Sequence, residues 1–334
     1  MIYISCPYGQ YTGGPTLAHQ LCFELIQNKI EAKMFYYGSN KKGDNPVHPN
    51  YKHFNNPFVT ELDHDVTDVI VILESKISLV SQYPKAKKYI WWMSVDNLFI
   101  SRMGYYRRLK KKIGMPYIDI EKERNGFKNK YSYIIRDDSI LHLYQSEYAK
   151  LFLLANGVED KKIFPLTDYV EEEIFDYARK NSNQNRKDVI LYNPKKGFEF
   201  TKKIIRTCSD LPYSFIPLVN MTKTEVSSHL CSSKLYIDFG THPGKDRFPR
   251  EAVISGCCLI TGRRGSANND IDIPIKDRYK FLDYDDNLLK IRDSIIYVMD
   301  NYDNAINDFE FYKKKIEGER DSFINEAIKI FKDV

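Results

Sequence analysis

The sequence lacks the motifs that would place it directly in several common classes. It contains neither G-X-G-X-X-G nor G-X-X-X-X-G-K-[ST], which disfavours a dinucleotide-dependent oxidoreductase and a P-loop protein. None of its six cysteines forms a Cys-X-X-Cys pair, and several lie in apolar runs such as SGCCLI, so we expect buried, reduced thiols. No apolar run approaches the roughly 20 residues of a membrane-spanning helix, and the first residues carry no signal-peptide pattern. We therefore expect a cytoplasmic protein.

Strong charge of either sign is also absent. The net charge of +5 is far from the basic stripe of a dedicated nucleic-acid-binding protein, so nucleic acid is not expected as a partner. A mildly basic chain suits an acidic ligand, such as a nucleoside diphosphate or an anionic membrane surface. The 334 residues, with 25 Tyr and 19 Phe, are enough for two domains and for aromatic rings that stack on sugars or bases.

Short apolar runs alternate with helical patterns along the whole chain. Such runs are typical of parallel strands buried on both faces. Strands are predicted at residues 2–5, 66–75, 87–95, 139–146 and 162–166, and again at 188–194, 213–220, 234–239 and 257–262.

A charged, Asn-rich stretch separates these two sets of strands. We predict an N-terminal Rossmann-like domain at residues 1–170, a linker at 171–187 and a C-terminal Rossmann-like domain at 188–334. We expect the last helix, about residues 310–334, to pack back toward the N-terminal domain. The predicted fold is α/β, with two Rossmann-like domains facing across a cleft.

Three loops share one pattern, in which a strand ends, Gly and basic residues follow, and a helix begins. They are NPKKG at 193–197, FGTHPGKD at 239–246 and GRRGSANN at 262–269. Ligands of open α/β sheets bind at the carboxyl ends of the strands, where helix N-termini present free N–H groups to phosphate. The loops therefore predict a nucleotide diphosphate site. Two structural alternatives remain: the basic residues can pair with Asp238 or Asp246, and Glu251 suits the first turn of a helix.

Four segments in this order resemble GT-B glycosyltransferases, most closely the family 4-like bacterial sugar transferases. They are TGGPTLAHQLCFEL, LYQSEYAKLFLLANGVEDKKIFPLTDYVEEEIF, LYNPKKG and FPREAVISGCCLITG, and they cover nearly the whole chain. The resemblance implies a hexosyltransferase of GT-B fold that needs no metal or cofactor. Its donor would be a nucleotide-sugar, and its acceptor a glycan or lipid-linked saccharide of a bacterial surface polysaccharide such as O-antigen or capsule.

The resemblance also implies roles for individual residues. Glu251 matches the second Glu of the family's E-X7-E motif, which holds the donor ribose, and Lys196 matches the lysine that contacts the diphosphate. Gly13 and Gly14 match the glycine loop near the donor phosphates and the acceptor. The first Glu of the motif would fall at Pro243, so contacts to the sugar must differ, and the stereochemical outcome is not predicted. The full predicted donor site is Gly13, Gly14, Asn193, Lys195, Lys196, Val219, Asn220, His242, Gly244, Lys245, Arg247, Arg250, Glu251, Arg263 and Arg264.

The first domain is expected to carry the acceptor. Asp96 follows a predicted strand and is the first candidate for the base that takes the acceptor proton, with His19 second. A helix-capping role for Asp96 and a packing role for His19 are the alternatives. Together with Glu251, these residues form the predicted catalytic set.

A basic, aromatic segment, MGYYRRLKKKIGMPY, lies in the same domain. Its basic residues would bind an anionic membrane surface, or they form an ordinary solvated charge run. They are Arg107, Arg108, Lys110, Lys111 and Lys112.

Two other functions remain open at this point. A sugar-nucleotide epimerase or hydrolase of the same fold would need no separate acceptor. A non-catalytic sugar-nucleotide-binding partner subunit would bind the donor without turnover.

Overall fold

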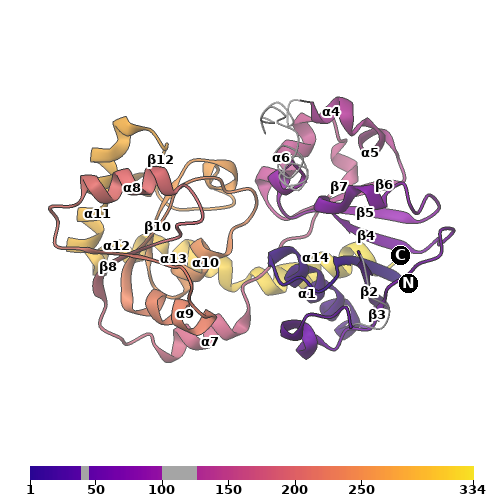
Figure 1. Ribbon diagram of the computed structural model, residues 1–334, viewed down its shortest axis with the longest axis horizontal. Coiled ribbons are helices and arrows are strands. Elements are labelled where there is room, and N and C mark those ends of the chain that lie inside the picture. The colour runs from indigo at the N-terminus through magenta and orange to yellow at the C-terminus, as the bar shows by residue number, and fades with distance from the viewer. Residues whose placement is uncertain (39–44, 100–125) are drawn as a thin grey trace, which may run out of the picture. The chain divides into compact units, whose positions relative to one another are not determined.

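The computed structural model describes residues 1–38, 45–99 and 126–334. The chain divides into two compact units, one formed by Met1–Asp168 with Asp321–Val334 and the other by Tyr169–Arg320 (Figure 1). Each unit is built on a parallel sheet, which confirms the predicted α/β class. The segment expected as a linker, 171–187, contains helix α7 (Glu172–Lys180) and lies in the second unit.

The first unit holds a seven-stranded parallel sheet in the order β3-β2-β1-β4-β5-β6-β7. The order reverses beside β1, which lies between β2 and β4, so ligands are expected at the carboxyl ends of β1 and β4. The strands are β1 (Ile2–Pro7), β2 (Ala32–Tyr37), β3 (Phe58–Val59), β4 (Val69–Leu73), β5 (Lys87–Trp92), β6 (Ile140–Tyr144) and β7 (Ile163–Pro165). Among the described residues, the helices of this unit are α1 (Gly13–Gln27), α4 (Phe127–Lys130), α5 (Ser132–Arg136), α6 (Glu147–Ala155) and, from Asp321 on, α14 (Glu319–Phe331), with the 3-10 helices η1 (Pro49–Phe54), η2 (Glu74–Leu79) and η3 (Asp160–Lys162).

Large aromatic side chains fill the core of the first unit. The tryptophan pair at the end of β5 is fully buried, as expected for a central parallel strand. From α14, Phe323 stacks on Trp91 with ring centroids 6.2 Å apart, and Phe331 lies 5.2 Å from Tyr89. The last helix is therefore part of the first unit's core.

The second unit holds a five-stranded parallel sheet in the order β12-β11-β10-β8-β9, whose order reverses between β8 and β10. Helices α8 and α11 pack together on one face, and α9, α10 and α13 lie on the other (Figure 1). The strands are β8 (Lys187–Tyr192), β9 (Ser214–Pro217), β10 (Ser233–Asp238), β11 (Cys258–Gly262) and β12 (Lys280–Phe281). Besides α7, the helices of this unit are α8 (Phe198–Thr207), α9 (Lys223–Ser232), α10 (Arg247–Ile254), α11 (Leu288–Asp300), α12 (Tyr302–Ala305) and α13 (Glu310–Glu317). Its 3-10 helices are η4 (Gly265–Asn268), η5 (Asp277–Tyr279), η6 (Asp285–Asn287) and η7 (Ile306–Phe309).

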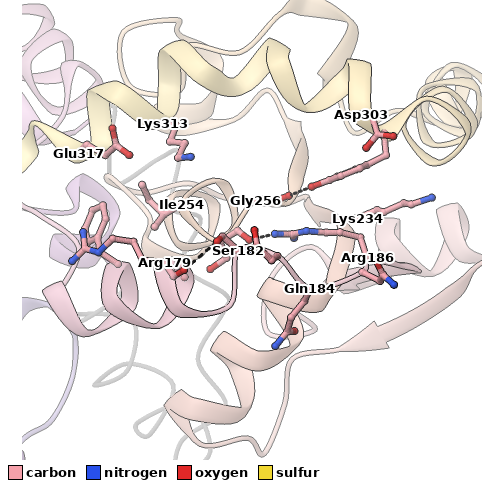
Figure 2. Close-up of a pocket in the computed structure, with 16 residues that line it drawn as sticks. Arg179, Ser182, Gln184, Arg186, Lys234, Ile254, Gly256, Asp303, Lys313 and Glu317 are labelled. Atoms are coloured by element: carbon pink, nitrogen blue, oxygen red, sulfur yellow. Dashed lines mark hydrogen bonds between the residues drawn. The ribbon is translucent and has the colours of Figure 1, made fainter.

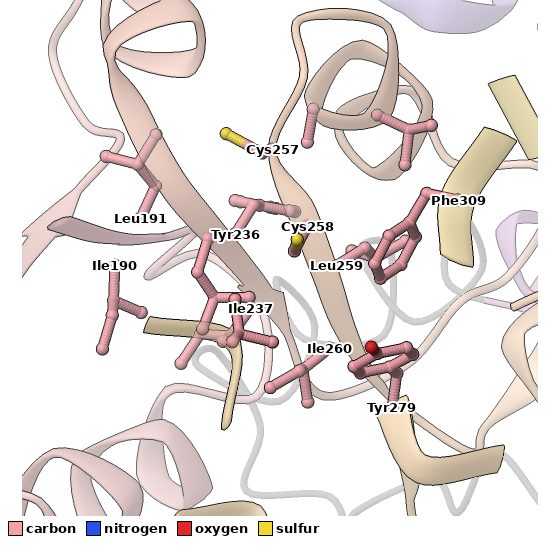
Figure 3. Close-up of a cluster of buried hydrophobic side chains, with 14 of the residues drawn as sticks. Ile190, Leu191, Tyr236, Ile237, Cys257, Cys258, Leu259, Ile260, Tyr279 and Phe309 are labelled. Atoms are coloured by element: carbon pink, nitrogen blue, oxygen red, sulfur yellow. The ribbon is translucent and has the colours of Figure 1, made fainter. Parts of the chain in front are cut away.

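The core of the second unit is a layer of aliphatic side chains and thiols on β8, β10 and β11 (Figure 3). Cys257 and Cys258 lie in this layer, and burial raises the pKa of Cys257 to about 12. All six cysteines are buried and free, which confirms the expectation of buried, unpaired thiols. Because the carboxyl halves of β8, β10 and β11 are buried, their side chains position the loops that follow these strands.

Candidate functional site

The three loops selected from the sequence form one structure at the carboxyl edge of the second sheet. We call them the β8 loop (193–197), the β10 loop (239–246) and the β11 loop (262–269). Gly197 and Gly240 lie back to back with φ of +53° and +112°, and a Cβ on Gly240 would lie 2.6 Å from the backbone N of Gly197. The β11 loop joins them through Ser266, whose N–H donates to the carbonyl of His242 at 2.9 Å and whose hydroxyl donates to the carbonyl of Gly244 at 2.6 Å.

Glycine is required where these loops meet. Both Gly197 and Gly240 have a φ that L side chains rarely adopt, and no side chain fits between the two backbones. The contact lies where the sheet order reverses, between β8 and β10, which is the usual ligand position in such sheets. The loops therefore meet where a ligand is expected.

Four charged side chains meet inside this structure. The Nδ1 atom of His242 lies 3.0 Å from Oδ2 of Asp246, and the Lys196 ammonium bonds the same oxygen. On its other side, His242 Nε2 lies 3.4 Å from the carbonyl oxygen and 4.0 Å from Oδ1 of Asp238. The Tyr236 hydroxyl donates to Oδ2 of Asp238 at 3.2 Å. One imidazole therefore lies between two carboxylates, and a lysine neutralises part of their charge.

Burial and the neighbouring charges shift the pKa values of the three titrating groups in this cluster, Asp238, His242 and Asp246. Burial alone would lower the pKa of His242, but the charges of Asp238 and Asp246 raise it above its ordinary value. Burial opposes ionisation of Asp246, yet the hydrogen bond from His242 and the charge of Lys196 hold its pKa below the usual range. Burial raises the pKa of Asp238. His242 therefore carries more positive charge near neutral pH than an exposed histidine would.

Asp238, His242 and Asp246 also have the side-chain types of a metal site. Their ligand atoms all lie within 4.8 Å of one another. However, the Lys196 ammonium already bonds the Asp246 carboxylate, so the cation of this cluster is supplied by the chain itself. The residues present therefore fit an organic cation pair better than a divalent ion.

Two predicted donor residues lie in a buried ion-pair network instead of at the loop surface. Arg250 is fully buried, and its Nη1 bonds Oε2 of Glu319 at 2.7 Å, while Lys245 Nζ lies 2.7 Å from Oε1 of Glu319. The Arg250 guanidinium also donates to the carbonyls of Asp246 and Lys245 at 3.2 and 3.1 Å. This network fixes the end of the β10 loop, so both cations act on the shape of the site.

Glu251 is buried and lies in the second turn of α10, so the structural alternative of a first-turn carboxylate does not apply. Arg247 Nη2 contacts its Oε1 at 2.9 Å and lies 3.5 Å from Oε2 of Glu171. Glu171 also accepts a hydrogen bond from Lys223 at 2.7 Å. A network that sequence reasoning did not identify thus holds Glu251 in one orientation.

The remaining predicted residues of the second unit lie on or beside the same edge. Asn193 Oδ1 accepts from the N–H of Lys195 at 3.0 Å, which shapes the β8 loop and leaves the Lys195 side chain exposed. Arg264 is half exposed and pairs with Asp283 at 3.1 Å. Arg263 bonds Asp277 and the carbonyl of Lys280, so it ties the β11 loop to β12. Val219 and Asn220 follow β9, and Asn220 has a φ of +54°.

In the first unit, the predicted residues surround the point where the sheet order reverses. Gly13 and Gly14 begin α1, and a Cβ on Gly14 would lie 3.6 Å from Sδ of Met93. Asp96 follows β5 and accepts from the Tyr148 hydroxyl at 3.5 Å.

His19 is placed as a packing residue. Its Nδ1 lies 2.9 Å from the carbonyl of Pro15, its Nε2 lies 2.8 Å from the Tyr36 hydroxyl, and its ring stacks on Tyr51. Burial lowers the pKa of His19 to about 4. Neither ring nitrogen is available to a substrate, so we do not retain His19 as a base.

Glu74 is a buried carboxyl group that sequence reasoning missed. It directly follows β4, and its Oε2 accepts from the N–H of Met93 at 3.3 Å. Burial raises the pKa of Glu74 to about 8, against the effect of its hydrogen bonds. An acidic residue at the end of the wholly apolar run VIVIL was the signal that could have identified it.

The predicted membrane surface, Arg107, Arg108, Lys110, Lys111 and Lys112, lies outside the described residues. Within the described ranges, every helix is too short or too polar to cross a lipid bilayer.

A cavity of about 660 Å³ lies at the opposite edge of the second sheet (Figure 2). Two of its lining residues are Arg186, which precedes β8, and Lys234, which lies near the start of β10. The cavity therefore lies at the amino ends of these strands. Arg186 donates to the carbonyls of Leu230 and Ser233 at 3.0 and 2.8 Å and to that of Ser255, so its guanidinium stabilises the fold. Because ligands of such sheets bind at the carboxyl edge, we place the functional site at the three loops.

Comparison with solved structures identifies the fold. HepE of Anabaena in complex with UDP-glucose superposes with a TM-score of 0.63 at 8% identity, over 100% of this chain and 99% of that chain. Sucrose-phosphate synthase of Thermosynechococcus elongatus gives 0.64 at 9% identity over 99% and 98%. A glycosyltransferase of Rickettsia africae ESF-5 gives 0.63 at 13% identity over 99% and 97%. No protein-family model and no curated protein matches the sequence.

These similarities show that the chain has the GT-B glycosyltransferase fold, as predicted. They extend over nearly the full length of both chains in each case. The closer likeness to family 4 stays a prediction.

Proposed function

We propose that the protein is a metal-independent glycosyltransferase. It would transfer a hexose from a nucleotide-sugar to a glycan or lipid-linked saccharide, as in the synthesis of a bacterial surface polysaccharide. The observation that carries this proposal is the meeting of three basic, glycine-containing loops at the reversal point of the second sheet. Structures of the same fold supply further support, since HepE was solved with UDP-glucose.

In this proposal, the donor diphosphate lies against the β8, β10 and β11 loops. Lys195, Lys196 and Arg264 are the cations that can reach it, and Arg263 supports the β11 loop. The N-termini of α8 and α10 open at the same edge and favour negative charge. Glu251, oriented by Arg247, would hold the ribose hydroxyls.

Electrostatic stabilisation of the leaving diphosphate is the main catalytic effect in this scheme. Fixed cations and helix N-termini meet the charge that develops as the bond to the sugar breaks, without solvent reorganisation. On the acceptor side, Asp96 would take the hydroxyl proton. The proton thus passes from the acceptor hydroxyl to Asp96, and the sugar passes from the diphosphate to the acceptor oxygen. The products are the glycosylated acceptor and a nucleoside diphosphate.

A ligand panel followed by turnover tests the proposal. UDP, GDP, ADP, dTDP, CMP and NAD are compared by thermal shift, since a ligand that binds only the folded state raises the Tm. One nucleoside diphosphate should raise the Tm, and Glu251→Ala or Lys196→Ala should remove this shift. Lys290→Ala, which removes an exposed lysine of α11, is the matched control.

The outcomes separate the alternative functions. A shift only with NAD, or unchanged binding and turnover in both variants, would refute the proposal. Release of free sugar from the donor alone indicates a hydrolase or epimerase. Donor binding without turnover in the presence of a broad acceptor panel indicates a non-catalytic partner subunit.

We also propose that the segment at 103–117 binds anionic lipid at the inner face of the cell membrane. Each basic residue near such a surface contributes about 1 kcal/mol. Charge reversal at Arg107, Arg108, Lys110, Lys111 and Lys112 should abolish binding to vesicles of phosphatidylglycerol and leave nucleotide binding intact. Unchanged vesicle binding would exclude this role.

A further inference from the structure

His242 lies inside the predicted donor site but is shielded from any ligand. Its side chain has no exposed surface, and its two ring nitrogens face Asp246 and Asp238. Its backbone carbonyl accepts from the N–H of Ser266 in the β11 loop. A donor bound at the loop surface therefore cannot contact the ring directly, so any effect of His242 on the donor must act through its charged neighbours.

Charged groups face His242 from every element packed around it. Asp238 ends β10, Asp246 precedes α10, and Asp283 follows β12. Two cations balance these three carboxylates: Lys196 on the β8 loop, which bonds Asp246, and Arg264 on the β11 loop, which bonds Asp283. The group thus has a formal charge of −1 when His242 is neutral and of zero when it is protonated. Protonation of His242 also changes the pKa of Asp283, which burial raises and the charges of Arg264 and His242 lower.

When His242 is neutral, the net negative charge of this group would strongly repel a diphosphate bound beside it. Lys196, the proposed diphosphate residue, shares its ammonium with Asp246, so the ligand and this carboxylate compete for one cation. Like charges in a poorly solvated site repel each other more than in water. When Lys196 turns to the ligand, His242 is the group that still neutralises Asp246.

We propose that His242 is a positioning residue of the donor site: its imidazolium is the buried counter-ion of Asp238 and Asp246, and it frees Lys196 to bind a diphosphate. The inference rests on the proposed function, because it assumes that the ligand is a nucleoside diphosphate. It replaces the sequence prediction of a direct donor contact. The shift of the His242 pKa above its ordinary value agrees with this role.

The test uses inorganic pyrophosphate and UDP as separate probes in isothermal titration calorimetry. His242→Gln should weaken the binding of pyrophosphate about tenfold or more, since one unit of charge is lost near the ligand. Asp246→Asn should bind at least as well as the wild type. The double variant should return to within about threefold of the wild type, because removal of the carboxylate removes the need for the counter-ion.

The pH dependence supplies a second readout. The advantage of the wild type over His242→Gln should be largest below the raised pKa of His242 and should disappear as the pH rises through it. Comparison at each pH cancels the titration of the ligand itself. His229→Gln removes a histidine of α9 in the same unit and should keep the wild-type profile.

Each result supports or overturns the inference. Equal weakening in His242→Gln and in the double variant would show that the ring acts as a ligand or as scaffold, and unchanged binding in His242→Gln would show that its charge is irrelevant. If pyrophosphate binds as expected but UDP and the other nucleotides do not, the proposed function fails while the role of His242 stands. Failure of the wild type to bind either probe overturns both.

Discussion

Arg250 offers the most direct test of how the end of the β10 loop is held in place. The sequence places it among the residues that grip phosphate, whereas the structure buries it completely against Glu319. Arg250→Met keeps the length of the side chain and removes its charge and donors. Removing one partner of a buried ion pair typically costs about 3–5 kcal/mol, because the other charge stays buried. Lys245 still pairs with Glu319, so we expect the lower end of that range.

The expected loss is large enough to measure in two ways. About 3 kcal/mol corresponds to a fall in Tm of roughly 6–12 °C for a domain of this size. Urea unfolding monitored by circular dichroism gives the free energy directly. Arg206→Met removes an exposed arginine of α8 and should change stability by less than about 0.5 kcal/mol.

Ligand binding decides between the two roles. In the folded fraction of Arg250→Met, measured well below its Tm, affinity for the nucleoside diphosphate should fall only modestly, since Lys196 and Lys195 remain. A variant as stable as the wild type that no longer binds the nucleotide would show that Arg250 contacts phosphate, and the reasoning from burial would be wrong.

Two further predictions concern the carboxyl edges of the sheets. The pKa of Glu74 is raised to about 8 from 4.5, so the folded protein holds this proton where the unfolded chain releases it, and the stability it contributes is present below pH 4.5 and lost as pH rises to about 8. In the wild type, this proton should make the free energy of unfolding fall by up to about 1.4 kcal/mol per pH unit between pH 5 and 8, and Glu74→Gln should remove this fall. Urea unfolding at several pH values measures it, and the same dependence on pH in both proteins would contradict the assignment. Gly240→Ala would place a methyl group 2.6 Å from the backbone N of Gly197 at a φ of +112°, so it should weaken nucleotide binding measured by calorimetry. Gly318→Ala is the matched control in the same unit, because Gly318 has a φ of −86° and an added Cβ would make only ordinary contacts of 3.7 and 3.8 Å. Equal nucleotide affinity in Gly240→Ala and the wild type would refute a role for the close contact.

The sequence predicted those strands whose hydrophobic residues form a continuous local run. The strands that were predicted in both sheets follow from largely apolar runs such as VIVIL, which suit a parallel strand buried on both faces. The meeting of the three loops also followed, since carboxyl ends of parallel strands share one edge. By contrast, β2 (Ala32–Tyr37) was not predicted. The strands β3 and β12 were also missed, since they have two residues each and carry no periodic signal. They form because neighbouring strands offer an edge to pair with.

Individual side-chain roles could not be predicted in the same way, because they depend on partners distant in the chain. Arg250 and Lys245 look like phosphate ligands in FGTHPGKDRFPRE, and nothing in that segment reveals Glu319, about 70 residues further on, whose carboxylate takes both. Lys196 differs only in its partner: Asp246 is a loop carboxylate that His242 can neutralise instead. A cation fixed by a buried acid maintains the shape of a site, whereas a cation whose acid has a second counter-ion is available to a ligand. This difference, which charge counting along the sequence does not detect, is why we propose Lys196, rather than Lys245 or Arg250, as a residue that binds the diphosphate.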